Sequence, residues 1–148
     1  MAASFGLAMT SALNRLARTH KDILMSDPRP VSLPILLEAL RAAGEATRLR
    51  VLALLAEGEL TVTELTEILG QSQPRVSRHL KLLVESGLVD RHPEGSWAFF
   101  RLSESEPAAD IARNITALLD PADPQRATDR ERFAAVRRAR SELSLIHI

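Results

Sequence analysis

The chain has 148 residues, of which 19 are basic and 19 acidic, and it contains no cysteine. This length favours a single domain, and the lack of cysteine excludes disulfides, thiolate metal ligands and cysteine nucleophiles. Hydrophobic residues account for 45% of the sequence but aromatic residues for only 3%, which predicts an aliphatic core packed between helices. Because the net charge is zero, attraction of an anionic partner would require a local patch of positive charge.

Residues 1–30 contain small side chains, several basic residues and no acid before Asp22. A secretory signal is not expected, because the apolar stretch is short and no basic region precedes it. We expect a disordered or frayed N-terminal extension, with either Met1 or Met25 as the natural start. No apolar run reaches the length of a membrane span, so no membrane partner is expected.

Two helices are predicted next, the first between Ser32 and Gly44 and the second over residues 46–56. The first has a leucine stripe and a second, smaller apolar face, formed by Leu33, Leu36, Leu37 and Leu40, and by Ile35, Ala39 and Ala42. A helix that is apolar on two faces needs two neighbours, and one of them could be another subunit.

A short extended piece at residues 59–61 leads into a third helix. The TVTE sequence at residues 61–64 matches a capping box, in which the first and last side chains bond to each other's backbone. Gly70 can adopt the left-handed conformation that a tight turn requires. Ser72 then caps a fourth helix, so the third and fourth helices form a turn-linked pair.

The fourth helix has a one-sided charge. Residues 71–82 contain four basic or imidazole side chains and no acid, although residues 45–67 contain five acids and two arginines. The spacing of Val76, Leu80 and Leu83 directs them to the core and leaves Arg78 and Lys81 on the opposite side. A local positive face of this kind indicates double-stranded DNA as the partner.

Two strand-like runs, residues 88–92 and 97–102, are joined by a turn and predict a hairpin. The whole order predicts a mainly α (α+β) fold: a winged helix-turn-helix with a short β-hairpin wing and flanking dimerisation helices. Such a fold places the second helix of the pair in the major groove. We expect Gln73, Ser77 and Arg78 to reach base edges and Ser72, Arg75 and Lys81 to contact phosphates, with His79 either on a phosphate or packed between helices, and Arg91, His92 and Arg101 near the DNA on the hairpin.

The C-terminal third changes in character. Residues 105–119 predict a helix capped by Ser105, with an apolar stripe made of Ala108, Ile111, Ile115, Leu118 and Leu119. Residues 125–140 are rich in arginine and poor in apolar residues, so we expect a linker-like helix that is frayed or held by a partner chain. The expected organisation is therefore an extension (1–30), a winged helix-turn-helix domain (31–120) and a linker-like helix and tail (121–148).

Three strings resemble the ArsR/SmtB family of small bacterial winged-helix repressors: ALRAAGEATRLRVLALL, GELTVTELTEILGQSQPRVSRHLKLLVESGLV and EGSWAFFRL. The resemblance covers about half of the chain, residues 33–103. It implies a cytoplasmic homodimeric repressor that binds a palindromic operator and is released by an effector, which the sequence does not identify. The dimer would be built from the first and last helices, with Leu36, Ala39, Leu40, Ile111, Ile115 and Leu118 at the interface.

The sequence departs from this family at the metal sites that the resemblance implies. Thr61 and Thr63 occupy the places of a Cys-x-Cys pair, and hydroxyl groups are poor ligands for soft metals. The second family site needs histidine on the last helix, where this chain offers Asp110 and Asp120 only. We therefore expect no metal and no cofactor.

Residues 33–140 also resemble a subgroup in which this domain precedes an S-adenosylmethionine-dependent methyltransferase. The alternative hypothesis is thus the N-terminal dimerisation or targeting module of a truncated methyltransferase. A winged helix used for protein–protein contact is a third hypothesis. The sequence shows no nucleophile, paired carboxylates, histidine cluster or phosphate loop, so no enzymatic activity is expected of it.

Overall fold

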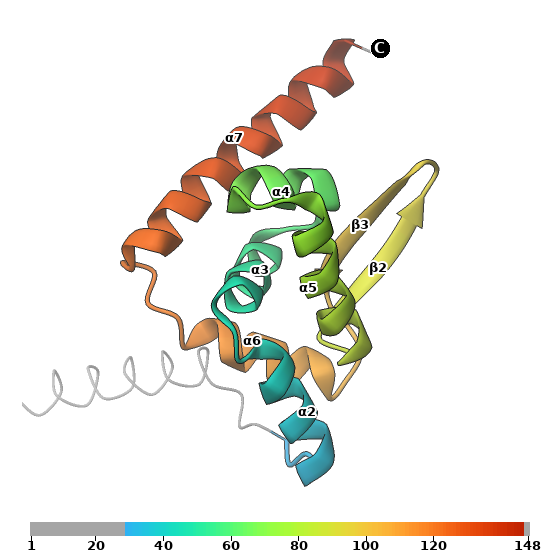
Figure 1. Cartoon of the computed structure of the whole chain (residues 1–148), viewed down its shortest axis with the longest axis vertical. Helices are drawn as coiled ribbons and strands as arrows, with labels where there is room; N and C mark the ends of the chain where they lie inside the picture. Colours follow the sequence, from blue (N-terminus) through green and yellow to red (C-terminus); the bar gives the residue numbers. More distant parts are fainter. Residues whose placement is uncertain (1–28, 147–148) are drawn as a thin grey trace, which may run out of the picture. The chain divides into compact units, whose positions relative to one another are not determined.

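The computed structural model describes residues 29–146, and the expected N-terminal extension lies almost entirely outside the described residues. By its contacts the chain divides after Pro30, and the second unit, from Val31 onward, is compact. In the second unit the elements follow in the order α2 (Leu33–Ala43), α3 (Ala46–Glu57), β1 (Leu60–Thr61), α4 (Val62–Leu69), α5 (Gln73–Glu85), β2 (Val89–Glu94), β3 (Trp97–Leu102), α6 (Ala108–Ala117) and α7 (Pro124–Ile146) (Figure 1). This order confirms the predicted winged helix-turn-helix, with α4 and α5 as the helix pair and β2–β3 as the wing.

The core is aliphatic and forms around α3, as the composition predicts. Residues Val51–Leu55 of α3 are all buried, because helices pack on several sides of this element. Their partners are fully or almost fully buried side chains from the neighbouring helices and strands, including Leu60, Leu65, Ile68, Val76, Leu80, Leu83 and Leu88. Val76, Leu80 and Leu83 are thus the core residues of α5 that the periodicity predicts.

The sheet is antiparallel with the strand order β1-β3-β2. The wing pairs over six positions, from Val89 opposite Leu102 to Glu94 opposite Trp97, and turns at Gly95, whose φ is 60°. In contrast, β1 contributes only two pairs to β3, Leu60 with Phe100 and Thr61 with Phe99. The ladder between β1 and the wing is therefore very short, and the base of the wing is also held by Val89 and Phe100, which are buried in the core.

The predicted capping box at the start of α4 is present in full. Thr61 Oγ1 accepts from the amide of Glu64 at 3.2 Å, and the Glu64 carboxylate accepts from the amide of Thr61 at 2.9 Å. Gly70 ends α4 with a φ of 64°, so the turn uses the left-handed conformation expected there.

Other predicted caps are not made. Ser32 and Ser72 precede α2 and α5 but form no side-chain cap, and each helix has a proline in its first turn. The prediction that Ser105 caps the next helix is wrong, because α6 begins at Ala108 after Pro107. Ser105 instead lies in a turn before the helix, where its amide donates to Ser103 Oγ at 3.2 Å.

The expectation for residues 125–140 is also wrong. One helix, α7, covers Pro124–Ile146 and packs against α3 and α4 of its own chain. Only Asp129 and Val136 of α7 are buried, and arginine side chains supply most of its polar contacts with the domain. The prediction considered only apolar burial, whereas α7 docks mainly through hydrogen bonds and ion pairs of its arginines.

Candidate nucleic-acid interface

The polar residues of α5 lie together on its outer face. Six of the predicted contact residues are exposed: Ser72, Gln73, Arg75, Ser77, Arg78 and Lys81. The helix can present them outward because Val76, Leu80 and Leu83, at 0–2% exposure, fix its other face in the core. The sequence therefore predicted this face correctly as an exposed surface.

The positive charge of this face is largely uncompensated. Lys81 Nζ lies 3.9 Å from Glu85 Oε1, but both side chains are more than half exposed, so the pair is weak. Within residues 29–146, neither Arg75 nor Arg78 has an acidic partner. An anion approaching α5 thus meets guanidinium groups that lose no internal ion pair on binding it.

His79 does not belong to this face, and of the two places expected for it the structure favours packing between helices. Its side chain is only 13% exposed and its Nδ1 lies 3.4 Å from Arg48 Nη1 and 3.7 Å from Glu45 Oε2. Burial lowers the pKa of His79, and the neighbouring Arg48, Arg75 and Arg78 lower it further, against the opposing effect of Glu45. His79 is therefore a largely neutral packing residue between α5 and the start of α3.

Glu45 holds the other side of this contact. Its carboxylate caps α3 by accepting from the amide of Arg48 at 3.0 Å. Burial raises the pKa of Glu45, but the amides of Arg48 and Thr47 and the charges of His79 and Arg48 outweigh it, so the pKa is lowered overall. The cap therefore stays ionised.

The three predicted hairpin residues lie on two different faces of the wing. Arg91 pairs with Phe100 in the ladder, and cross-strand partners share a face, so Arg91 lies on the side of α5. His92 pairs with Phe99, and Arg101 pairs with Asp90, on the opposite face. Arg101 also lies 3.9 Å from Glu104. The structure thus brings only Arg91 together with the exposed face of α5.

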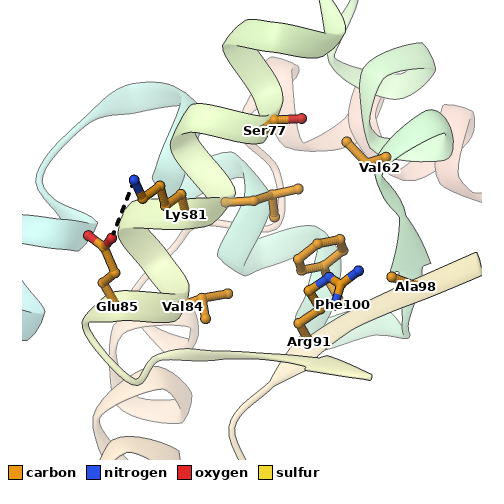
Figure 2. A pocket seen from close by; sticks show the side chains of 9 residues that line it. Val62, Ser77, Lys81, Val84, Glu85, Arg91, Ala98 and Phe100 are labelled. Atoms are coloured by element: carbon orange, nitrogen blue, oxygen red, sulfur yellow. Dashed lines mark ion pairs between the residues drawn. The ribbon is translucent and has the colours of Figure 1, made fainter. Parts of the chain in front are cut away.

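Between α5 and the wing lies a groove of about 420 Å³ (Figure 2). Its floor is apolar, with Val62, Leu80, Val84, Ala98 and Phe100, and its rim carries Ser77, Lys81, Glu85 and Arg91. Figure 2 shows Arg91 rising from β2 beside the Phe100 ring while Lys81 points toward Glu85. The groove places the wing cation and the helix cation on one continuous surface.

A second surface, on α2, is apolar and exposed. It comprises Leu33, Ile35, Leu36, Leu37 and Leu40, which are 37–77% exposed, and Leu118, just after the end of α6, is also exposed at 84%. Two of the predicted interface residues need correction: Ala39 and Ile111 are 2% and 7% exposed and belong to the core of their own chain. Ile115 is partly buried against the same core. The apolar surface is therefore narrower than the helical stripes indicated.

Thr61 and Thr63, which stand at the family's expected metal-ligand positions, have other surroundings in this structure. Thr61 is buried and its hydroxyl forms the helix cap described above, while Thr63 is exposed. Among residues 29–146, no three His, Asp or Glu side chains are grouped so that they could hold a metal ion. Within the same range, none of the helices has the length and apolar character needed to cross a membrane.

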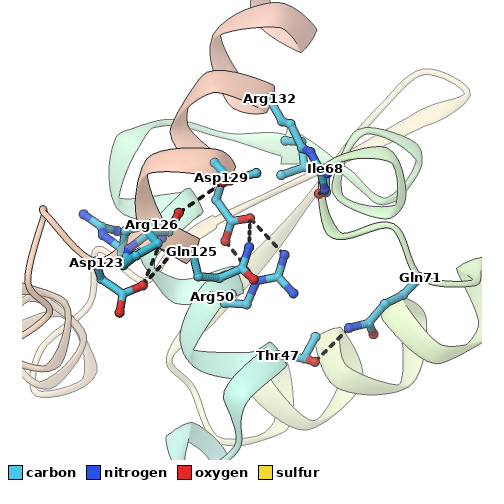
Figure 3. Close-up of polar contacts among 11 residues, drawn as sticks. Thr47, Arg50, Ile68, Gln71, Asp123, Gln125, Arg126, Asp129 and Arg132 are labelled. Carbon is cyan, nitrogen blue, oxygen red and sulfur yellow. Dashed lines mark hydrogen bonds and ion pairs between the residues drawn. The ribbon is translucent and has the colours of Figure 1, made fainter.

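Sequence reasoning missed the arginines of α7. Arg132 donates to the carbonyl of Ile68 at 2.9 Å, and Arg137 and Arg140 both donate to the carbonyl of Glu59 at 3.2 Å. Figure 3 shows the α7 end of this network, with Arg132 reaching Ile68 and Arg50 reaching Asp129. A signal was available: Arg126, Asp129, Phe133, Val136, Arg137 and Arg140 recur at helical spacing and form one mixed stripe.

A turn-linked helix pair with an outward polar face, followed by a hairpin, defines a winged helix-turn-helix protein. Residues 45–91 match the family described as "Bacterial regulatory protein, arsR family". The chain is 36% identical over 84 residues to an uncharacterized HTH-type transcriptional regulator of Methanocaldococcus jannaschii, covering 56% of this chain and 89% of that protein. The chain belongs to the arsR family of bacterial regulatory proteins.

Two further relatives extend this comparison. The arsenical resistance operon repressor of Escherichia coli K12 is 49% identical over 77 residues, which are 51% of this chain and 64% of the repressor. The chain thus spans less than two thirds of that relative's length. The homodimeric winged helix-turn-helix DNA-binding domain of Mb0332 from Mycobacterium bovis is similar in structure, with a TM-score of 0.52, 28% identity, and coverage of 62% of this chain and 81% of that one.

Proposed function

We propose that this chain is a sequence-specific, double-stranded-DNA-binding transcriptional regulator. The observation that carries the proposal is the outer face of α5, where polar and basic side chains are exposed and largely without internal partners while the apolar side is fixed in the core. The second helix of such a pair enters the major groove, where the donor and acceptor pattern of each base pair can be read. The E. coli relative is named an operon repressor, which supports the same assignment.

The exposed residues divide into two roles. Arg78 and Gln73 carry side chains that can bond two atoms of a guanine or an adenine, and Ser77 can bond to any base edge. Ser72, Arg75 and Lys81 would contact phosphates, which position the protein without reading sequence. Arg91 on the wing joins the phosphate contacts because it shares the groove with Lys81.

The apolar surface of α2 and Leu118 supports a homodimer. Six large apolar side chains on these elements are exposed in the single chain, more than scattered surface residues would explain. A two-fold dimer buries the same patch on both subunits and presents two α5 helices to the DNA. The operator would then be a palindrome with half-sites about one helical turn apart.

The remaining assignments follow from the same family. The chain would act as a repressor in the cytoplasm, controlled by an effector of unknown identity, with no catalytic activity, metal or cofactor of its own. The relatives compared above are named as regulators, and they do not support the alternative of a methyltransferase module.

Selection of bound duplexes from random DNA tests the proposal. We expect one enriched palindrome, and an affinity for it that falls steeply as the salt concentration rises, because phosphate contacts release counterions. Failure to enrich any sequence, together with no salt-dependent binding to random duplex, would overturn the proposal in favour of a protein-contact role for the winged helix.

A further inference from the structure

Arg140, near the C-terminal end of α7, joins three elements of the domain. Its Nε donates to Glu64 Oε1 at 2.9 Å, its Nη2 donates to the carbonyl of Glu59 at 3.2 Å, and its guanidinium lies 5.2 Å from the centre of the Phe99 ring. Glu64 belongs to α4, Glu59 precedes β1, and Phe99 belongs to wing strand β3. One side chain therefore contacts the helix pair, the residue that leads into the short strand, and the wing.

These contacts meet where the wing leaves the body. The ladder between β1 and the wing has two residue pairs, and one of them is Thr61 with Phe99. Thr61 is also the cap of α4, and its amide donates to the same Glu64 carboxylate that Arg140 binds. Arg140 thus contacts the residues around Thr61, which both caps α4 and pairs with Phe99 in the ladder.

The contact is suited to fix a geometry. An arginine with two donors on one carboxylate holds both groups in a plane, and the aromatic ring beneath restricts the guanidinium further. The side chains of Arg140 and Glu64 are only 30% and 16% exposed, so water competes for these bonds less than at an open surface. Val89 and Phe100 fix the base of the wing in the core, but its other residues are partly or fully exposed, so the outer wing could hinge without the Arg140 contact.

The rest of α7 holds Arg140 in place. Arg132 and Arg137 bind carbonyl groups at the two ends of the β1–α4 segment, at Ile68 and Glu59. Gly58 permits this close approach: a Cβ there would lie 3.2 Å from Phe133 Cζ and 3.2 Å from Arg137 Nη1. Displacement of α7 would therefore withdraw Arg140 from the joint.

We propose that Arg140 is a positioning residue that sets the orientation of the wing relative to α5, so that DNA binding depends on the docking of α7. The contacts of Arg140 alone support its role in orienting the wing. The expected effect on DNA affinity also rests on the proposed DNA-binding function. With α7 docked, Arg91 and Lys81 are held on one surface. With α7 displaced, the wing hinges and Arg91 no longer shares that surface.

Trp97 provides a direct readout, because it is the only tryptophan of the chain and lies on β3, two residues from Phe99. We would measure its time-resolved fluorescence anisotropy in free protein, and operator affinity in parallel, for Arg140→Gln and for the control Arg138→Gln. Arg138 is exposed on α7 and makes no hydrogen bond or ion pair within residues 29–146. Arg140→Gln should increase the mobility of Trp97 and weaken operator binding roughly tenfold, and Arg138→Gln should change neither.

Three further variants keep the test independent of simple unfolding. Phe99→Leu removes the stacked ring and Gly58→Val lifts α7 by steric contact, and both should reproduce the two effects at temperatures well below the melting transition. Arg140→Lys, which retains the charge but not the two-pronged contact, should fall between Arg140→Gln and the unchanged protein. Trp97 mobility equal in Arg140→Gln and Arg138→Gln would overturn the proposal, as would increased mobility with unchanged operator affinity.

This test separates the present proposal from the proposed function. If the unchanged protein selects no duplex, DNA binding fails as a function, and the mobility of Trp97 still decides whether Arg140 positions the wing. If the unchanged protein binds its operator and Arg140→Gln binds it equally well, only the present proposal fails.

Discussion

Arg50 on α3 and Asp129 on α7 are 79 residues apart in the chain and are joined by two hydrogen bonds of 2.9 Å each. Asp129 also accepts from Gln125 at 3.0 Å and is 3% exposed, so its carboxylate is almost fully enclosed by donors (Figure 3). The hydrogen bonds to Asp129 raise the pKa of Arg50, although its burial acts in the opposite direction. This pair is the polar centre of the contact between α7 and the core.

Asp129→Ala should therefore destabilise the protein. It leaves Arg50 partly buried without a counter-charge, which costs about 3 kcal/mol in the free energy of unfolding. Urea unfolding monitored by circular dichroism measures the loss. The control is Glu131→Ala, an exposed residue on the same helix, and equal stabilities for the two variants would contradict the structural role of the pair.

His79 should make stability depend on pH. Its pKa is lowered in the folded protein, so the unfolded chain binds a proton first as the pH falls through 6.5, the ordinary value. The free energy of unfolding is then greatest above that value and decreases below it. Glu45, whose pKa is lowered from 4.5, adds a second decrease at more acidic pH.

Thermal melts across this range should show the first decrease in the unchanged protein and a smaller one in His79→Gln. His92→Gln on the wing is the matched control, because it removes a histidine that lies away from the α3–α5 contact. A pH dependence that His79→Gln leaves intact would show that another group is responsible.

Arg78 and Lys81 should differ in their effect on DNA binding. Arg78→Ala should weaken the selected operator by about 1–3 kcal/mol and relax sequence preference at one base pair, since a base contact is lost. Lys81→Ala should weaken all duplexes alike and reduce the salt dependence by about one unit of slope. Binding titrations at several salt concentrations distinguish the two. An unchanged ratio of operator to random-DNA affinity in Arg78→Ala would contradict its base-reading role.

The dimer proposal makes a prediction about exposed leucines. Leu118 and Leu40 are 84% and 49% exposed in the single chain, so Leu118→Glu and Leu40→Glu should leave the fold intact. Each places a charge in the proposed dimer interface, so self-association should be lost. Sedimentation equilibrium should show monomers, and operator affinity should fall in parallel. Leu145→Glu, 72% exposed on α7, should remain a dimer. A monomeric unchanged protein at micromolar concentration would exclude the dimer altogether.

Metals should have no effect on DNA binding. Thr61 uses its hydroxyl to cap α4, Thr63 is exposed, and the sequence has no cysteine. We expect operator affinity to be the same with zinc, cadmium or arsenite present and with a chelator. Release of DNA at equimolar metal would show that ligands other than these positions form a site.

The sequence predicted those elements whose signals are local. The TVTE cap, the left-handed Gly70 and the spacing of Val76, Leu80 and Leu83 each depend on residues within one turn or one helix, and the structure shows all three. It did not predict which way His79 faces, because that depends on Glu45 and Arg48 across an interhelical contact. The faces of Arg91 and His92 required the exact register of the hairpin, and a one-residue shift would exchange them.

The docking of α7 could not be read from apolar periodicity. Its stripe mixes Asp129, Phe133 and Val136 with three arginines, and a charged stripe on a helix is most often a solvated face. The deciding information is the set of carbonyl groups at Ile68 and Glu59 that lie opposite these arginines, which only the fold brings into range.

The scarcity of buried apolar residues on α7 has a thermodynamic consequence. Detaching this helix would expose little hydrocarbon to water, so the step would have a small heat-capacity change and its free energy would vary almost linearly with temperature. Its more exposed ion pair, Arg130 with Glu57, would weaken as the salt concentration rises, whereas the more enclosed contacts of Asp129 and Arg140 would be screened less. Ionic strength would thus loosen the helix only in part, at contacts that are distinct from the aliphatic core around α3.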